Sequence, residues 1–66
     1  MSISYNKLWK LLIDKNMKKK DLKTITGISS SSIAKLGKNE PVTLEVLMKI
    51  CLALDCNIGD IVEFVK

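Results

Sequence analysis

Histidine is absent from the sequence, and the two cysteines are poorly placed for metal binding. Cys51 and Cys56 lie five positions apart, which does not match a CxxC metal site and does not put both thiols on one helix face. The seven carboxylates are scattered, neither thiol has a paired base, and no phosphate-binding glycine loop occurs. We therefore expect no enzyme, no catalytic residue, no metal and no cofactor.

Long apolar runs and a secretion signal are also missing. No run approaches the ~20 residues that a membrane-spanning helix needs. The first residues, MSISYNKLW, lack the basic segment and following apolar run of a signal peptide. Two free thiols in such a chain suit a reducing compartment. These absences predict a cytoplasmic protein that is neither secreted nor inserted in a membrane.

Proline and glycine are scarce, with one proline and three glycines in 66 residues. Hydrophobic residues make up 47 %, which is too many for a disordered segment. We expect one compact helical domain over residues 1–66, with short turns. A chain of this length buries only about 60 % of its unfolded surface, so its stability is marginal.

The formal net charge is +4, but the charges are unevenly distributed. Residues 1–38 contain nine of the eleven lysines and only two acidic residues, a net charge of +7. Residues 39–66 contain two lysines and five acidic residues, a net charge of −3. The basic half can therefore face a polyanion such as DNA while the acidic half stays away from it.

Apolar residues recur five positions apart around a polar residue, which is the spacing of the staple that flanks a helix start. Five such pairs occur, and four of them enclose a good capping residue, namely Ser4, Ser29, Thr43 or Asn57. No alternating strand pattern of useful length is present. We predict an all-α fold of five helices, over about residues 5–15, 19–26, 30–38, 44–55 and 58–65.

Residues 18–39, KKKDLKTITGISSSSIAKLGKN, have the pattern of two short helices joined by a glycine turn. Gly27 can adopt the positive φ that follows a helix, and Ser29 can cap the N–H groups of the next helix. Each helix has an apolar face, made by Leu22 with Ile25 and by Ile33 with Leu36. Such a unit is a helix-turn-helix, whose second helix can enter a DNA major groove.

Three consecutive lysines, Lys18, Lys19 and Lys20, crowd the N-terminal end of the first of these helices. Positive charge there opposes the helix dipole, and Asp21 offsets only part of the cost. Alone, such a run favours a solvated lysine face, but beside a helix-turn-helix it favours a phosphate-binding one. The predicted outward positions of the second helix are Ser30, Ser31, Ala34, Lys35 and Lys38.

Three features keep more than one interpretation. Asn39 can close the second helix in a left-handed conformation, whereas Gly37 is either the closing residue or a weak point in the last turn. Tyr5 and Trp9, four positions apart, can pack under the C-terminus or form a partner-binding pair. The predicted helix over 58–65 has surplus apolar residues, which can close the core over Trp9 or form a dimer seam.

The order of these motifs resembles the Cro and phage-repressor-like helix-turn-helix family, also called the XRE family, over nearly the whole chain. The matching residues of the core motif are Asp21, Leu22, Gly27, Ile28, Ser29, Ile33 and Leu36. The segment LEVLMKICLALDCNIGDIV is similar to the closing helices of the family. The resemblance is greatest to small single-domain bacterial members with a LWKLLIDKNMKKKDL-type start.

This resemblance implies a five-helix lambda-repressor-like domain whose third helix reads double-stranded DNA. The positions that it places at bases are Ser30, Ser31 and Lys35. The positions expected at the DNA backbone are Lys18, Lys19, Lys20, Ser29, Lys38 and Asn39. Since members commonly bind two-fold sites as dimers, a homodimer is expected at least on DNA, with no membrane partner and no small-molecule effector.

Three residues depart from the family pattern. Lys23 stands where alanine is usual between the two helices, so its stem must reach solvent. Leu12 stands where an arginine is frequent, so an ion pair common in the family is absent. Lys19 replaces a frequent glutamine, which favours charge over amide hydrogen bonding at the DNA backbone.

The leading hypothesis is a sequence-preferring DNA-binding transcriptional regulator. An alternative is a protein–protein module, antitoxin-like or a regulator's partner, that would use Tyr5, Trp9, Phe64 and Val65 as anchors. A third hypothesis is a membrane-surface helix over YNKLWKLLIDKNMKKK, which is basic and amphipathic. The break at Asn16 and the need for that apolar face in the core disfavour it.

Overall fold

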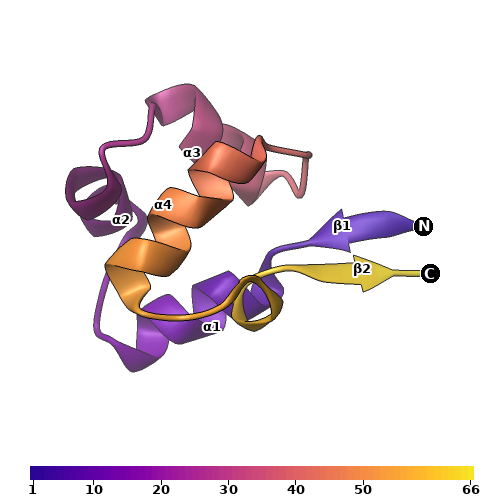
Figure 1. The fold of residues 1–66 in the computed structure, drawn as a ribbon, viewed down its shortest axis with the longest axis horizontal. Helices are drawn as coiled ribbons and strands as arrows, with labels where there is room; N and C mark the ends of the chain where they lie inside the picture. Colours follow the sequence, from indigo (N-terminus) through magenta and orange to yellow (C-terminus); the bar gives the residue numbers. More distant parts are fainter.

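A computed structural model describes residues 1–66, the whole sequence. Four α-helices pack around one core, and the two ends of the chain pair as a short sheet (Figure 1). The elements are β1 (Ser2–Ser4), α1 (Asn6–Asp14), α2 (Lys19–Thr26), α3 (Ser30–Gly37), α4 (Leu44–Leu54), the 3₁₀ turn η1 (Ile58–Asp60) and β2 (Glu63–Val65). The all-α class is confirmed, and the first four helices lie within one residue of their predicted bounds.

The fifth predicted helix, over residues 58–65, is wrong. Only the single turn η1 forms there, and the chain then extends into β2, which pairs antiparallel with β1. In this register Ile3 opposes Phe64. The pairing satisfies backbone groups that a helix would have satisfied internally, and strands of three residues are too short to show alternation in a sequence. The expectation that the chain contains no strand is also wrong, because β1 and β2 are too short to show an alternating pattern.

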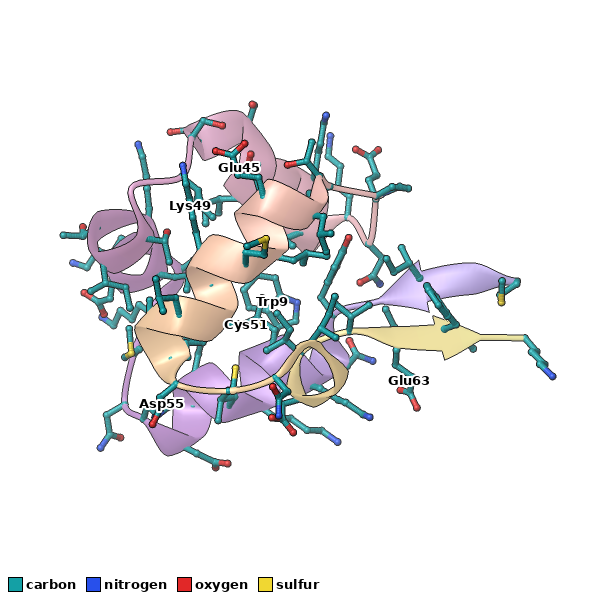
Figure 2. All side chains as sticks on the ribbon, viewed as in Figure 1. Trp9, Glu45, Lys49, Cys51, Asp55 and Glu63 are labelled. Carbon is teal, nitrogen blue, oxygen red and sulfur yellow. The ribbon has the colours of Figure 1, made fainter.

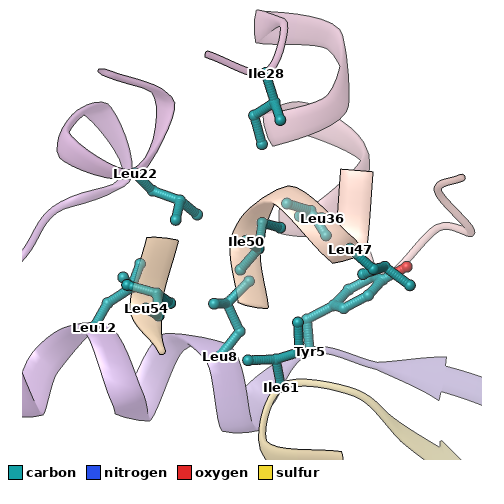
Figure 3. Packing of buried hydrophobic residues seen from close by; sticks show 10 residues of the cluster. All are labelled: Tyr5, Leu8, Leu12, Leu22, Ile28, Leu36, Leu47, Ile50, Leu54 and Ile61. Atoms are coloured by element: carbon teal, nitrogen blue, oxygen red, sulfur yellow. The ribbon is translucent and has the colours of Figure 1, made fainter. Parts of the chain in front are cut away.

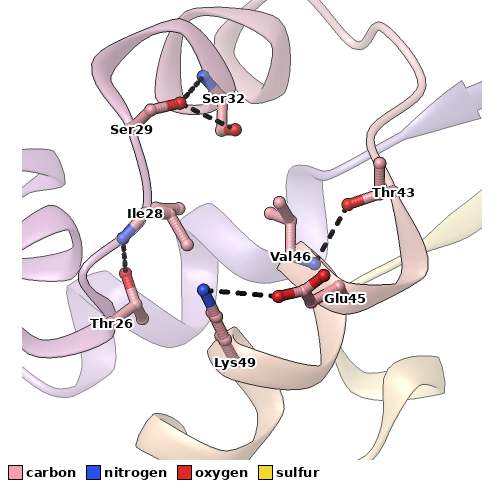
Figure 4. Close-up of polar contacts among 8 residues, drawn as sticks. All are labelled: Thr26, Ile28, Ser29, Ser32, Thr43, Glu45, Val46 and Lys49. Carbon is pink, nitrogen blue, oxygen red and sulfur yellow. Dashed lines mark hydrogen bonds and ion pairs between the residues drawn. The ribbon is translucent and has the colours of Figure 1, made fainter.

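The turn between α2 and α3 has the predicted chemistry. Gly27 is left-handed, with φ 71°, and its N–H closes the last turn of α2. Ser29 is extended, and its Oγ accepts a hydrogen bond from the Ser32 N–H at 3.2 Å (Figure 4). At the other end of α2, the Asp21 carboxylate accepts from the Lys18 N–H at 2.8 Å. These contacts set where each of the two helices begins and ends.

Three of the four helices are followed by a non-glycine residue with positive φ, namely Asn16, Asn39 and Asp55. Asn and Asp adopt this left-handed conformation more readily than most residues. After α3, the next N–H beyond Asn39 returns to the Lys35 carbonyl at 2.9 Å. Asn39 is therefore the residue that closes α3, and Gly37 is the last residue within it.

Ten buried hydrophobic side chains form one core between the four helices and the turn after α4 (Figure 3). They are Tyr5, Leu8, Leu12, Leu22, Ile28, Leu36, Leu47, Ile50, Leu54 and Ile61. The predicted apolar face of α2 is only half correct, because Leu22 is fully buried while Ile25 is 48 % exposed. None of the four helices combines the length and apolar character that a bilayer crossing requires.

Tyr5 is a core residue and cannot serve as a partner-binding anchor, because none of its surface is exposed. It belongs to the same buried cluster as Ile61, from the segment after α4 (Figure 3). Its hydroxyl donates to the Glu40 carbonyl at 2.7 Å, and its N–H donates to Asn39 Oδ1 at 3.1 Å. Tyr5 thus packs under the C-terminal segment and fastens the loop after α3 to the start of α1.

Candidate nucleic-acid interface

The helix α3 presents hydroxyl and lysine side chains to solvent. Leu36 is fully buried and anchors the helix to the core. The five predicted outward residues are all exposed, namely Ser30, Ser31, Ala34, Lys35 and Lys38. The side chains of Lys35 and Lys38 make no ion pair and no hydrogen bond within the protein. Both ammonium groups are therefore free to contact an external anion.

Lys23 of α2 reaches the first residue of α3. Its Nζ donates a hydrogen bond to Ser30 Oγ at 2.6 Å, and both residues are exposed. The departure from alanine at this position is accommodated as expected, since the stem runs out to solvent. The contact with Ser30 was not expected, because it depends on the distance between two helices that periodicity does not give. Lys23 therefore joins the candidate site beside a predicted base-reading residue.

The serine run is ordered by hydrogen bonds at the start of α3. Ser29 Oγ lies 3.1 Å from Ser31 Oγ and donates to Ser32 Oγ at 3.1 Å. The same oxygen caps the helix by accepting from the Ser32 N–H (Figure 4). The four serines are therefore held in place at the start of the helix. Ser29 uses its hydroxyl within the protein, whereas Ser30 and Ser31 keep hydrogen-bonding capacity toward solvent.

The predicted backbone-contacting residues fall into two groups. Lys18, Lys20 and Lys38 are exposed, and their side chains form no hydrogen bond or ion pair within the protein. Lys19 lies with its Nζ 4.7 Å from the centre of the Trp9 ring. Asn39 is exposed, but its Oδ1 accepts from Tyr5, which leaves its amide N–H groups for an outside partner.

Trp9 is the second residue that the sequence did not place at this site. It is half-buried and packs against the core, and its ring contacts the ammonium of Lys19. Spacing along α1 indicated only a stripe shared with Tyr5. No pattern within one helix could show that Trp9 meets the first residue of another.

Acidic side chains do not neutralise this face. The one ion pair in the protein joins Glu45 to Lys49 on α4 at 3.7 Å (Figures 2 and 4). Asp21, within α2, accepts from a backbone N–H and forms no ion pair with a neighbouring lysine. The lysines of α2 and α3 therefore keep their positive charge available.

The Cys56 thiol offers little nucleophilic character. Cys51 and Cys56 are half-buried, and both pack against the core. Burial, together with the neighbouring Cys51, raises the pKa of Cys56 to about 11. Its reactive thiolate form is therefore scarce near neutral pH.

Comparisons with known proteins agree with this geometry. The family model of the Cro/C1-type HTH DNA-binding domain matches residues 7–66. The solved structure of the transcriptional regulator VanUg (form II) shares 60 % sequence identity, with a TM-score of 0.91. That match covers 94 % of this chain and 83 % of the VanUg chain. No curated protein matches significantly. The chain belongs to the family of Cro/C1-type helix-turn-helix DNA-binding domains.

Proposed function

We propose that residues 1–66 act as one domain, a sequence-preferring transcriptional regulator that inserts α3 into the DNA major groove. The observation that carries this proposal is the arrangement of charge around α3. Lys23 meets its first residue, Lys19 reaches its last turn at Gly37, and no acidic side chain pairs with either lysine. The similarity to a transcriptional regulator supports the regulatory role.

Ser30, Ser31 and Lys35 contact base edges in this proposal. Serine hydroxyls can donate to or accept from almost any base, so these two residues discriminate weakly. The ammonium of Lys35 can reach O6 and N7 of guanine. One long side chain among short ones gives modest direct readout, with sequence-dependent groove shape supplying the rest.

The backbone-contacting set consists of Lys18, Lys19, Lys20, Ser29, Lys38 and Asn39. Lysines that neutralise phosphates release condensed counterions, so binding weakens as salt rises. If about five phosphates are neutralised per subunit, log K falls with log salt at a slope of about −4 to −5. Ser29 contributes through its position at the N-terminus of α3, because its hydroxyl is engaged within the protein.

The protein acts as a homodimer on DNA in this proposal. Leu44, Met48 and Leu52 recur every four residues along α4, so they share one helix face, and all are exposed. In an antiparallel pairing of two α4 helices about Met48, Glu45 of one copy lies beside Lys49 of the other. Sedimentation with and without DNA tests this arrangement by counting the protein copies in the complex. We expect two copies on DNA for the wild type and one for Met48→Asp.

Selection of bound sequences from a random DNA pool, at two salt concentrations, tests the proposed function. We expect an enriched half-site with guanine at the position that Lys35→Ala relaxes. Lys66→Ala is the matched control, because it removes one exposed lysine outside α2, α3 and the proposed dimer face. Failure to enrich any half-site at either salt would contradict the proposal.

One observation keeps a second candidate function, the binding of a protein partner. Phe64, in β2, is 67 % exposed, and Val65 beside it is 45 % exposed. Tyr5 and a C-terminal helix no longer contribute to such a surface, since Tyr5 is buried and the helix does not form. If selection enriches no DNA, pull-down with wild-type protein against Phe64→Ser separates this candidate from the first.

A further inference from the structure

The ammonium of Lys19 sits where three helices meet. Lys19 is the first residue of α2, and its Nζ lies 4.7 Å from the centre of the Trp9 ring on α1. On the other side is α3, where a Cβ added to Gly37 would lie 3.4 Å from the same Nζ. The ammonium is thus held between an aromatic face and a stretch of bare backbone.

The Trp9 ring is held in place by packing against the core. Trp9 is half-buried and packs against the core cluster, next to the fully buried Leu8. A cation over the face of an indole is attracted to it, and tryptophan is the best of the aromatic rings for this contact. Gly37 leaves the opposite side open, since an alanine there would just touch the ammonium and a branched side chain would displace it.

The contact leaves Lys19 charged and available. No carboxylate lies within ion-pair distance of its Nζ, and the residue is exposed like its neighbours Lys18 and Lys20. An ammonium has three N–H donors, and a ring face uses none of them as a full hydrogen bond. Lys19 is therefore oriented without being neutralised, unlike a lysine paired with glutamate.

We propose that Trp9 is a positioning residue for DNA binding, which holds Lys19 in the conformation that meets a phosphate. This inference rests on the proposed function. A free lysine side chain loses rotamer freedom when it binds, and a lysine that is already ordered loses less. The benefit should be about two- to tenfold in DNA affinity, the range for one preordered side chain.

The double-mutant cycle of Trp9→Leu and Lys19→Gln tests whether Trp9 acts through Lys19. The probe is a short mixed-sequence duplex at low salt, because phosphate contacts do not need a specific site. Trp9→Leu should weaken binding about two- to tenfold in the wild-type background and have no effect once Lys19 is Gln. Trp9→Phe should restore most of the affinity, because phenylalanine also offers a ring face.

Thermal unfolding of every variant checks that the fold is kept, and a second measurement needs no DNA. Trp9 is the only tryptophan, so its emission should differ between wild type and Lys19→Gln, and should change when duplex is added to wild type. The positioning role would be overturned if Trp9→Leu lowered DNA affinity equally in wild type and in Lys19→Gln. It would also be overturned if Lys19→Gln left the Trp9 emission unchanged. If the Trp9 emission differs between wild type and Lys19→Gln but the wild-type protein binds no duplex, the proposed function is contradicted instead.

Discussion

The α2–α3 half and the α4 half of the molecule follow different local rules, although they share one core. α4 is capped by Thr43, whose side chain accepts a hydrogen bond from the Val46 N–H at 3.3 Å. The first turn of α4 contains Glu45. That glutamate suits the helix dipole and pairs with Lys49. α2 is preceded by Lys18, whose side chain makes no capping bond, and its first turn adds two more lysines.

The difference indicates where stability has been exchanged for binding. Lysines at a helix N-terminus are unfavourable, and exposed serines early in α3 add no apolar burial. A sequence optimised only for folding would resemble α4 throughout. Local choices that weaken a helix, gathered on one face of a fold, are expected at functional sites. The contrast therefore supports the α2–α3 face as the one that binds DNA.

The largest effect should come from neutralising the start of α2. Combined Lys18→Gln, Lys19→Gln and Lys20→Gln should weaken DNA binding roughly 10- to 100-fold at low salt, since exposed charge contacts contribute up to ~1 kcal/mol each. The slope of log K against log salt should become shallower by about 0.9 for each phosphate that the variant no longer neutralises. Fluorescence anisotropy over a salt series measures both quantities.

Lys18→Gln with Lys20→Gln, which keeps the contact of Lys19 with Trp9, should be more stable than wild type. Removing these two charges, which oppose the dipole of α2, should raise the free energy of unfolding by about 0.3 kcal/mol or more per charge. Lys66→Gln is the control, which removes charge from the acidic half outside the proposed dimer face and should leave the salt slope unchanged. An equal change of slope in that control would remove the distinction between the two halves.

Lys35→Ala tests the readout by α3 rather than the general charge. The loss should be about 1–3 kcal/mol on the best site and much smaller on a mixed-sequence duplex. Competition binding with both duplexes gives the ratio. A uniform loss on both would assign Lys35 to a phosphate, and no loss on either would remove it from the interface.

Much of this fold could be predicted because its signals are local. The caps Ser29 and Thr43, the turn glycine Gly27 and the staple spacing act within a few residues, and α1 to α4 begin where these signals predict. The segment after Asn57 carries the same local signal, but it folds into a single turn and a strand. Pairing with β1, more than fifty residues away in sequence, decided the outcome, and no local pattern reports that.

The candidate site divides in the same way. The exposure of Ser30, Ser31 and Lys35 follows from helical periodicity once Leu36 is placed in the core. The contacts of Lys23 with Ser30 and of Lys19 with Trp9 cross between helices, so they depend on how the helices pack. Sequence reasoning could name the face but not the neighbours that orient its lysines.

Matched caps in the two halves sharpen the comparison further. Ser29→Ala and Thr43→Ala should each lower the free energy of unfolding by about 1 kcal/mol, because each removes one side-chain cap. Only Ser29→Ala should also weaken DNA binding, since it loosens the start of α3. Urea unfolding and anisotropy on both variants give the two readouts. Equal DNA affinities for the pair would show that the start of α3 does not need its cap to bind.

The smallest effect is a pH dependence carried by Tyr5, whose hydroxyl fastens the loop between α3 and α4 to the start of α1. Burial raises the pKa of Tyr5 above its ordinary value of 10.0, although a backbone hydrogen bond from Val42 opposes the shift. Above about pH 10 the unfolded chain releases this proton while the folded chain keeps it, so stability is lost as pH rises further. Tyr5→Phe should cost about 1 kcal/mol below that pH, because the 2.7 Å hydrogen bond is removed, and should flatten the alkaline decline. Urea unfolding of both proteins across that range measures the difference, and parallel alkaline declines would assign the loss to the lysines alone.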